Sequence, residues 1–153
     1  MSDHRARIEW NLQGAFEHRT YSRTHGMDFG AGVVVPGNAA AGNVPPTVPA
    51  AHGVDPEQAF VASLSTCHML WLLHLASRAK LTVTRYLDEA SGVLQKGPQG
   101  KWMMNRVRLR PAVTFSGTAP AAQEHGQLHH RAHEECYVAN SVRTQVICLA
   151  AVA

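Results

Sequence analysis

Two cysteines of this chain have neighbours that suggest thiol chemistry. Cys67 stands in the segment Ser-Leu-Ser-Thr-Cys-His-Met-Leu, and Cys136 follows His-Glu-Glu. A thiolate that attacks a peroxide oxygen becomes a sulfenic acid, which a second thiol condenses into a disulfide. Such a cycle needs a cation that favours the thiolate and a pocket that admits a hydroperoxide. Taken singly, each cysteine equally fits a buried core position, because free cysteine is among the most buried residue types.

The third cysteine has a different setting. Cys148 lies in the apolar run Val-Ile-Cys-Leu, so we expect it to be a core residue. Three cysteines are an odd number, which in a reducing compartment indicates catalytic or metal-binding thiols rather than a disulfide framework. The N-terminus has no apolar stretch typical of a signal peptide, and we expect a cytoplasmic protein.

The histidines offer an alternative chemistry. His129 and His133 are spaced i, i+4 on a predicted helix and Cys136 follows at i+7, a pattern compatible with a metal site. A metal-binding or redox-sensor protein using these three residues is therefore the alternative hypothesis. His68 and His74 lie on an apolar helix, where hydrogen-bonded core positions are expected. His68 is also a candidate to line a pocket beside Cys67.

Periodicity and turn residues predict the elements that position these side chains. Asp55, Pro56 and Gln58 form a strong helix start, with a capping residue, a proline at the first helical position and a capping-box partner. The helix should run to about residue 80, and its apolar residues on nearly every side indicate a central, buried helix. Strands are expected at residues 6–12, 20–29, 33–35, 83–95, 102–115 and 144–152, and a helix at 121–135, followed by a turn around Cys136 and a short helix that ends at Arg143.

This order of elements predicts an α+β fold in a single domain, residues 1–153. The first strands should form an antiparallel meander, and residues 83–95 and 102–115 a hairpin around Gly97 and Gly100. The composition is 45% hydrophobic and 16% charged, as expected for one packed core. The basic residues form no run and aromatic residues are 7% of the chain, so we expect no nucleic-acid partner. No uninterrupted apolar segment is long enough to predict a membrane span.

A family resemblance rests on two motifs. Residues 55–70, Asp-Pro-Glu-Gln-Ala-Phe-Val-Ala-Ser-Leu-Ser-Thr-Cys-His-Met-Leu, resemble the first signature of the OsmC/Ohr family, in which the reactive cysteine follows the Pro-Glu helix start by ten residues. Residues 132–136, Ala-His-Glu-Glu-Cys, with Asn-Ser-Val at 140–142, resemble the second signature. Both occur in the expected order, and the predicted strands and hairpin agree with the family's fold.

The resemblance implies a fold, an activity and a set of site residues. It implies antiparallel sheets with a long central buried helix in an intertwined homodimer, and a peroxidase that reduces organic hydroperoxides without cofactor or metal. Cys67 resembles the peroxidatic thiol, Cys136 the resolving thiol and Glu57 the acidic partner of an arginine. Arg23 is the expected arginine, with Arg19 as the alternative. An external dithiol of lipoyl or thioredoxin type is implied as the reductant.

The spacing of Glu57 and Cys67 adds a geometric constraint. Ten residues of α-helix rise about 15 Å, so the two side chains of one chain hardly touch on an unbroken helix. Either the helix is interrupted, or an arginine reaches in from another element, or a second subunit supplies its own Glu57 or Arg23. We expect an obligate homodimer with shared sites. A third hypothesis, a cysteine acyl-transfer enzyme with a histidine base, requires an oxyanion site that the sequence does not reveal.

Overall fold

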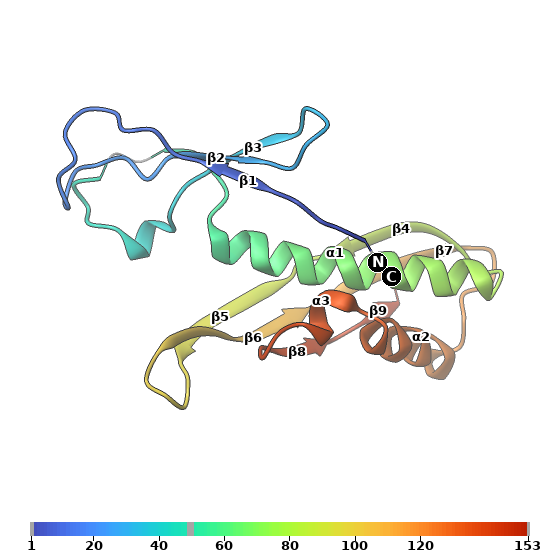
Figure 1. Cartoon of the computed structure of the whole chain (residues 1–153). Coiled ribbons are helices and arrows are strands. Elements are labelled where there is room, and N and C mark those ends of the chain that lie inside the picture. Colours follow the sequence, from blue (N-terminus) through green and yellow to red (C-terminus); the bar gives the residue numbers. More distant parts are fainter. Residues whose placement is uncertain (1, 49–50, 153) are drawn as a thin grey trace. The chain divides into compact units, whose positions relative to one another are not determined.

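The structure is a computed structural model that describes residues 2–48 and 51–152. The chain divides into two compact units, Met1–Ala59 and Phe60–Ala153 (Figure 1). The prediction that these residues form a single domain stays a prediction.

The first unit holds a small antiparallel sheet, as the glycine-punctuated pattern predicts. Its strands are β1 (Arg7–Glu9), β2 (His25–Asp28) and β3 (Val34–Gly37), in the order β1-β2-β3, followed by a 3-10 turn at Ala41–Asn43. Strand β1 is shorter than the predicted 6–12, because its partner β2 pairs only from Asp28 to Gly26. Ile8 pairs with Met27, yet its side chain is 61% exposed, so strand pairing does not bury it.

Helix α1 (Pro56–Arg78) begins where the capping signal predicts. The amide N–H of Gln58 donates to the Asp55 carboxylate at 2.7 Å, and the Gln58 side chain accepts from the Asp55 amide at 3.1 Å. This reciprocal capping box satisfies two of the amides that a helix start leaves without partners. The predicted start of the helix is confirmed.

Helix α1 buries one face. The buried residues recur at helical spacing, namely Leu64, His68, Leu72, Leu75 and Ala76. On another face, Leu70 is 59% exposed. The helix is apolar on nearly every side, but this chain does not bury every side of it. The helix is also long and apolar enough to cross a membrane, a property that core helices share.

In the second unit the predicted hairpin divides into two sheets. The strands are β4 (Thr82–Asp88), β5 (Ser91–Lys96), β6 (Trp102–Leu109) and β7 (Pro111–Ser116), where β4 pairs with β7 and β5 with β6, all antiparallel. The C-terminal strands β8 (Gln145–Cys148) and β9 (Ala151–Val152) add in parallel, which gives the orders β5-β6-β8 and β4-β7-β9. Each sheet therefore mixes one antiparallel and one parallel pair.

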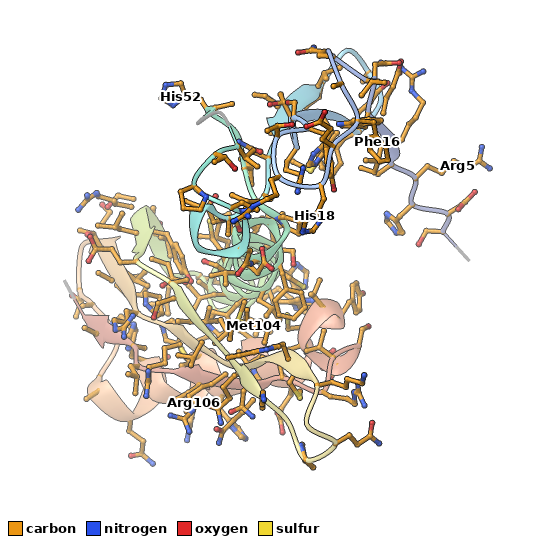
Figure 2. All side chains as sticks on the ribbon, turned by 90° about the vertical axis from the view of Figure 1, so that its left-hand side faces the viewer. Arg5, Phe16, His18, His52, Met104 and Arg106 are labelled. Carbon is orange, nitrogen blue, oxygen red and sulfur yellow. The ribbon has the colours of Figure 1, made fainter. Side chains whose placement is uncertain are left out.

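In strand β6, the alternation of apolar and basic residues determines which side chains are buried. Val107 and Leu109 are buried at 0% and 1% exposure, as their alternation with arginines predicts. Register shifts at Asn105, where Val93 pairs with Arg106 and Leu94 with Met104. This bulge turns Met104 to the side of Leu64 on α1, whereas Arg106 points to the other side of the strand (Figure 2).

Two helices complete the second unit. Helix α2 (Ala122–Glu134) and the short helix α3 (Tyr137–Asn140) lie close to the predicted positions, with Cys136 between them. Leu128 and Ala132 of α2 pack with Leu72 and Leu75 of α1 and with Val113 of β7. Helices α1 and α2 and strand β7 thereby share one hydrophobic core.

Candidate functional site

Cys67 lines an apolar pocket in the second unit. The cavity has a volume of about 320 Å³ and is lined by Cys67, Leu70, Trp71, His74 and Tyr137. The first four are on α1 at spacings of three, four and seven residues, which place them on one side of the helix. The pocket therefore presents a half-buried thiol beside apolar and aromatic surface.

Aromatic contacts shape this pocket. The Trp71 ring meets the Tyr137 ring edge to face at a centroid distance of 5.5 Å, and the His74 ring in the same way at 5.6 Å. Tyr137 is nevertheless 70% exposed. His68, which the sequence suggested for the pocket, does not line it and is buried in the core, whereas Leu70 and Trp71 do line it. Sequence reasoning missed Tyr137 as a wall of the site, although it directly follows Cys136.

Cys136 is buried and interacts with Cys67. It is 1% exposed and caps α3, where its sulfur accepts the Ala139 amide at 3.4 Å. The pKa of Cys136 is raised to about 11, mainly by burial and also by the neighbouring Cys67 side chain, whereas the Ala139 amide opposes the rise. All three cysteines are free thiols. The structure thus brings together the two cysteines that the motifs single out.

The expected arginine and glutamate have other partners within the first unit. The Arg23 guanidinium donates to the carbonyls of Tyr21 at 2.6 Å and His18 at 3.2 Å, and its carbon lies 3.2 Å from the centre of the Tyr21 ring. Glu57 accepts from the Asn43 side chain at 3.5 Å. Among residues 2–48 and 51–152, neither Arg23 nor Glu57 takes part in an ion pair. Arg19, the alternative, is exposed and accepts a hydrogen bond from Thr47 through its carbonyl.

The course of α1 decides one of the three ways in which Glu57 or Arg23 could reach Cys67, namely an interruption of the helix. The helix is continuous between Glu57 and Cys67. An interruption that would bring the two side chains of one chain together is therefore excluded.

The histidines form a cluster that differs from the one the spacing suggested. The alternative hypothesis groups His129 with His133 and Cys136, but the Nδ1 atom of His129 lies 2.9 Å from Nε2 of His68 and 3.6 Å from the sulfur of Cys148. In the described part of the chain, His68, His129 and Cys148 are the one group with metal-ligating atoms this close together. The i, i+4 spacing puts His129 and His133 on one helix face. The thiol that lies near His129 is Cys148, which comes from strand β8, and not Cys136.

Burial governs the protonation of this cluster. It lowers the pKa of His68 to about 4 and that of His129 to about 3, with neighbouring histidines adding to both effects. Burial and, to a smaller extent, the Asp88 carboxylate together raise the pKa of Cys148 to about 11. His68 is thus the hydrogen-bonded core histidine that was predicted. Cys148 was expected to be an apolar core residue, but its sulfur contacts the ring nitrogens of two histidines.

Comparison with known proteins identifies the family of this chain. The sequence model of the OsmC-like protein family matches residues 49–148, which include all three cysteines. The chain belongs to the OsmC-like family. Its α+β fold and the family resemblance of its two motifs are thereby confirmed.

Solved structures of OsmC-like proteins place the chain within the family. An OsmC-like protein of unknown function from Vibrio cholerae is 42% identical, with a TM-score of 0.94 over 99% of this chain and 100% of the other. An OsmC-like protein from Mycoplasma pneumoniae is 12% identical, with a TM-score of 0.76 over 99% and 98% of the two chains. An organic hydroperoxide resistance protein from Elizabethkingia anophelis is 16% identical, with a TM-score of 0.64 over 100% and 96%. The last two share the fold alone. No curated protein matches the sequence.

Proposed function

We propose that this OsmC-like protein is a two-thiol peroxidase that reduces organic hydroperoxides to alcohols. The observation that carries the proposal is the interaction of Cys67, which faces an apolar pocket, with the buried thiol of Cys136. The first thiol borders a cavity that a substrate can enter, and the second lies near enough to the first for each to affect the other, which supports a redox cycle between them. Structural neighbours that are organic hydroperoxide resistance proteins support the same chemistry.

The proposed cycle has three balanced steps. The Cys67 thiolate attacks the terminal peroxide oxygen, the O–O bond breaks, and the alkoxide takes a proton to leave as an alcohol. The resulting sulfenic acid reacts with the Cys136 thiol to form a disulfide and water. An external dithiol, of lipoyl or thioredoxin type, then reduces the disulfide and becomes oxidised. The sum is one hydroperoxide and one dithiol converted to alcohol, water and one disulfide.

The properties of Cys136 suit the resolving role. With a pKa of about 11 it is a protonated thiol at neutral pH, and its proton leaves with the hydroxyl group of the sulfenic acid as water. Its burial keeps it away from peroxide in bulk solvent, so the first oxidation falls on Cys67. The pair therefore divides the work between an accessible nucleophile and a sheltered partner.

The lining of the pocket supports a preference for bulky apolar peroxides. Leu70, Trp71 and Tyr137 offer apolar and aromatic surface to an alkyl or aryl group, and hydrogen peroxide has no such group to place there. The substrate class that we propose is accordingly an organic hydroperoxide.

We also propose a cytoplasmic homodimer in which the partner completes the site. Ile8 and Phe16 of the first unit are 61% and 69% exposed, and a partner surface that covers these large apolar side chains would remove them from water. A second copy that covers these residues would bring its Arg23, with Glu57 as positioning residue, toward the Cys67 thiolate. A guanidinium there would favour the thiolate and stabilise the departing alkoxide. Three free thiols suit a reducing cytoplasm.

The test measures turnover of cumene hydroperoxide with a dithiol reductant, for the wild type and for Cys67→Ser, Cys136→Ser and His130→Gln. His130 is exposed on α2, and within the described part of the chain its ion-pair partner is Glu134 alone, so its variant is a control for preparation and folding. Cys67→Ser should lose turnover, Cys136→Ser should slow it, and His130→Gln should match the wild type. Undiminished turnover in Cys67→Ser would rule out the proposed nucleophile.

A further inference from the structure

His68, His129 and Cys148 converge from three elements that are distant in the sequence. His68 is on α1, His129 on α2 and Cys148 at the end of β8, and α2 and β8 lie on the same side of α1 (Figure 1). The two histidines are 1% and 4% exposed. The proposed peroxide chemistry uses none of these three side chains.

Two of the three distances among the ligand atoms match those of a tetrahedral metal centre, and the third is a few tenths of an ångström shorter. Metal–nitrogen bonds of about 2.05 Å and metal–sulfur bonds of about 2.3 Å place two nitrogens about 3.3 Å apart and a nitrogen and a sulfur about 3.6 Å apart. Here the sulfur of Cys148 lies 3.7 Å from Nε2 of His68 and 3.6 Å from Nδ1 of His129. The two nitrogens are 2.9 Å apart, so a shift of a few tenths of an ångström opens the site.

From this geometry we propose that His68, His129 and Cys148 bind one zinc ion per chain, with a fourth position left to water. The set of two imidazoles and one thiolate suits zinc, which accepts nitrogen and sulfur ligands in tetrahedral sites. The ion would join α1, α2 and β8. The site is separate from the Cys67 pocket, because none of its three ligands lines that pocket.

The surroundings of the three ligands fit a cation. Nε2 of His129 lies 3.3 Å from Nε2 of His125, so His125 can accept the remaining His129 proton and fix the ring as outer partners of metal-bound histidines do. The Asp88 carboxylate acts electrostatically on both His68 and Cys148, and a negative charge nearby favours a bound cation. Among the described residues, two buried side-chain atoms have no hydrogen-bond partner, Nδ1 of His68 and the hydroxyl of Tyr86. Asp88 and Cys148 both raise the pKa of the Tyr86 hydroxyl, although burial contributes most to that rise.

The test uses the full chain with Cys67→Ser and Cys136→Ser, so that Cys148 is the remaining thiol of the three in the sequence. After treatment with a chelator, the protein is titrated with Co²⁺, whose complexes with thiolate show an intense charge-transfer absorption, and then with Zn²⁺. We expect one Co²⁺ per chain with that absorption, its loss on displacement by Zn²⁺, and a higher thermal unfolding midpoint with Zn²⁺. A protein that binds neither ion overturns the proposal without need of a further variant.

Further variants in the same background assign the ligands. Cys148→Ser and Cys148→Ala should abolish the charge-transfer absorption, and His129→Gln should weaken zinc binding at least about tenfold, since even the loss of an outer partner does so. His130→Gln is the matched control, because His130 is an exposed histidine next to His129 on the same helix and outside the cluster, and it should leave zinc affinity unchanged. An absorption that survives the Cys148 variants, or an equal loss of affinity in His130→Gln, contradicts the assignment. Near-ultraviolet circular dichroism of each variant verifies that the protein compared is folded.

Discussion

The side chain of Cys67 faces an apolar pocket and at the same time interacts with the thiol of Cys136, which is 1% exposed. The contact joins the middle of a long helix to the turn between two later helices, sixty-nine positions along the chain. It is the relationship from which the proposed peroxidase cycle follows.

Replacing Cys136 separates the two half-reactions. In Cys136→Ser we expect one equivalent of cumene hydroperoxide to leave Cys67 as a sulfenic acid, because no resolving thiol is within reach. Dimedone labelling followed by mass spectrometry should detect the adduct on Cys67 in this variant and little of it in the wild type. Equal labelling of the two proteins would remove Cys136 from the cycle.

Leu70 should contribute to substrate preference. We expect Leu70→Ser to lower kcat/KM for cumene hydroperoxide by about tenfold, the effect of one lost apolar contact of roughly 1–3 kcal/mol, with a smaller effect on hydrogen peroxide. Leu87→Ser is the matched control, since Leu87 is 43% exposed on β4 and lies outside the pocket. Equal losses for both peroxides would argue against a pocket that recognises the organic group.

The buried thiol of Cys136 predicts a pH dependence of stability. Its pKa rises from about 9 in the unfolded chain to about 11 in the folded protein, so the unfolded state releases its proton first as the pH rises. Stability from this group is complete below pH 9 and is lost toward pH 11, up to about 2 kcal/mol of the free energy of unfolding. Urea unfolding across this range should show a smaller decline in Cys136→Ser. An identical slope in both proteins would contradict the prediction.

Two glycines should respond in opposite ways to substitution by alanine. A Cβ atom at Gly92 would lie 2.5 Å from the Met104 sulfur and 2.7 Å from a Val61 methyl carbon, so Gly92→Ala should cost about 1–3 kcal/mol. At Gly126, inside α2, the Cβ would meet no atom within 4 Å, and Gly126→Ala should stabilise by about 0.5–1 kcal/mol. Chemical unfolding measures both, and a stable Gly92→Ala would show that β5 and α1 are less closely packed than described.

What the sequence predicted well was local. The start of α1 follows from Asp55 and Gln58, whose side chains act on amides three residues away, and the burial of Val107 and Leu109 follows from strand alternation. The bulge at Asn105 and the division of the hairpin into two sheets leave no such local signal. They depend on how the strands pack against other elements.

The site shows the same limit. Cys67 and Cys136 were found through their motifs, but Tyr137 was recognised as a pocket wall only through its contact with Trp71. Likewise, spacing suggested His129 with His133, whereas contacts over 61 and 19 positions join His129 to His68 and Cys148. Helical periodicity indicates which residues share a face, but it does not indicate which other element packs against that face.

The proposed cycle is tested most directly by mapping the product of one turnover without reductant. The reduced wild-type protein receives one equivalent of cumene hydroperoxide per chain and is digested under conditions that preserve disulfides for mass spectrometry. The account predicts one disulfide, between Cys67 and Cys136, with Cys148 recovered as a free thiol and one equivalent of the alcohol. Three free thiols after the treatment, or a disulfide that contains Cys148, would contradict it.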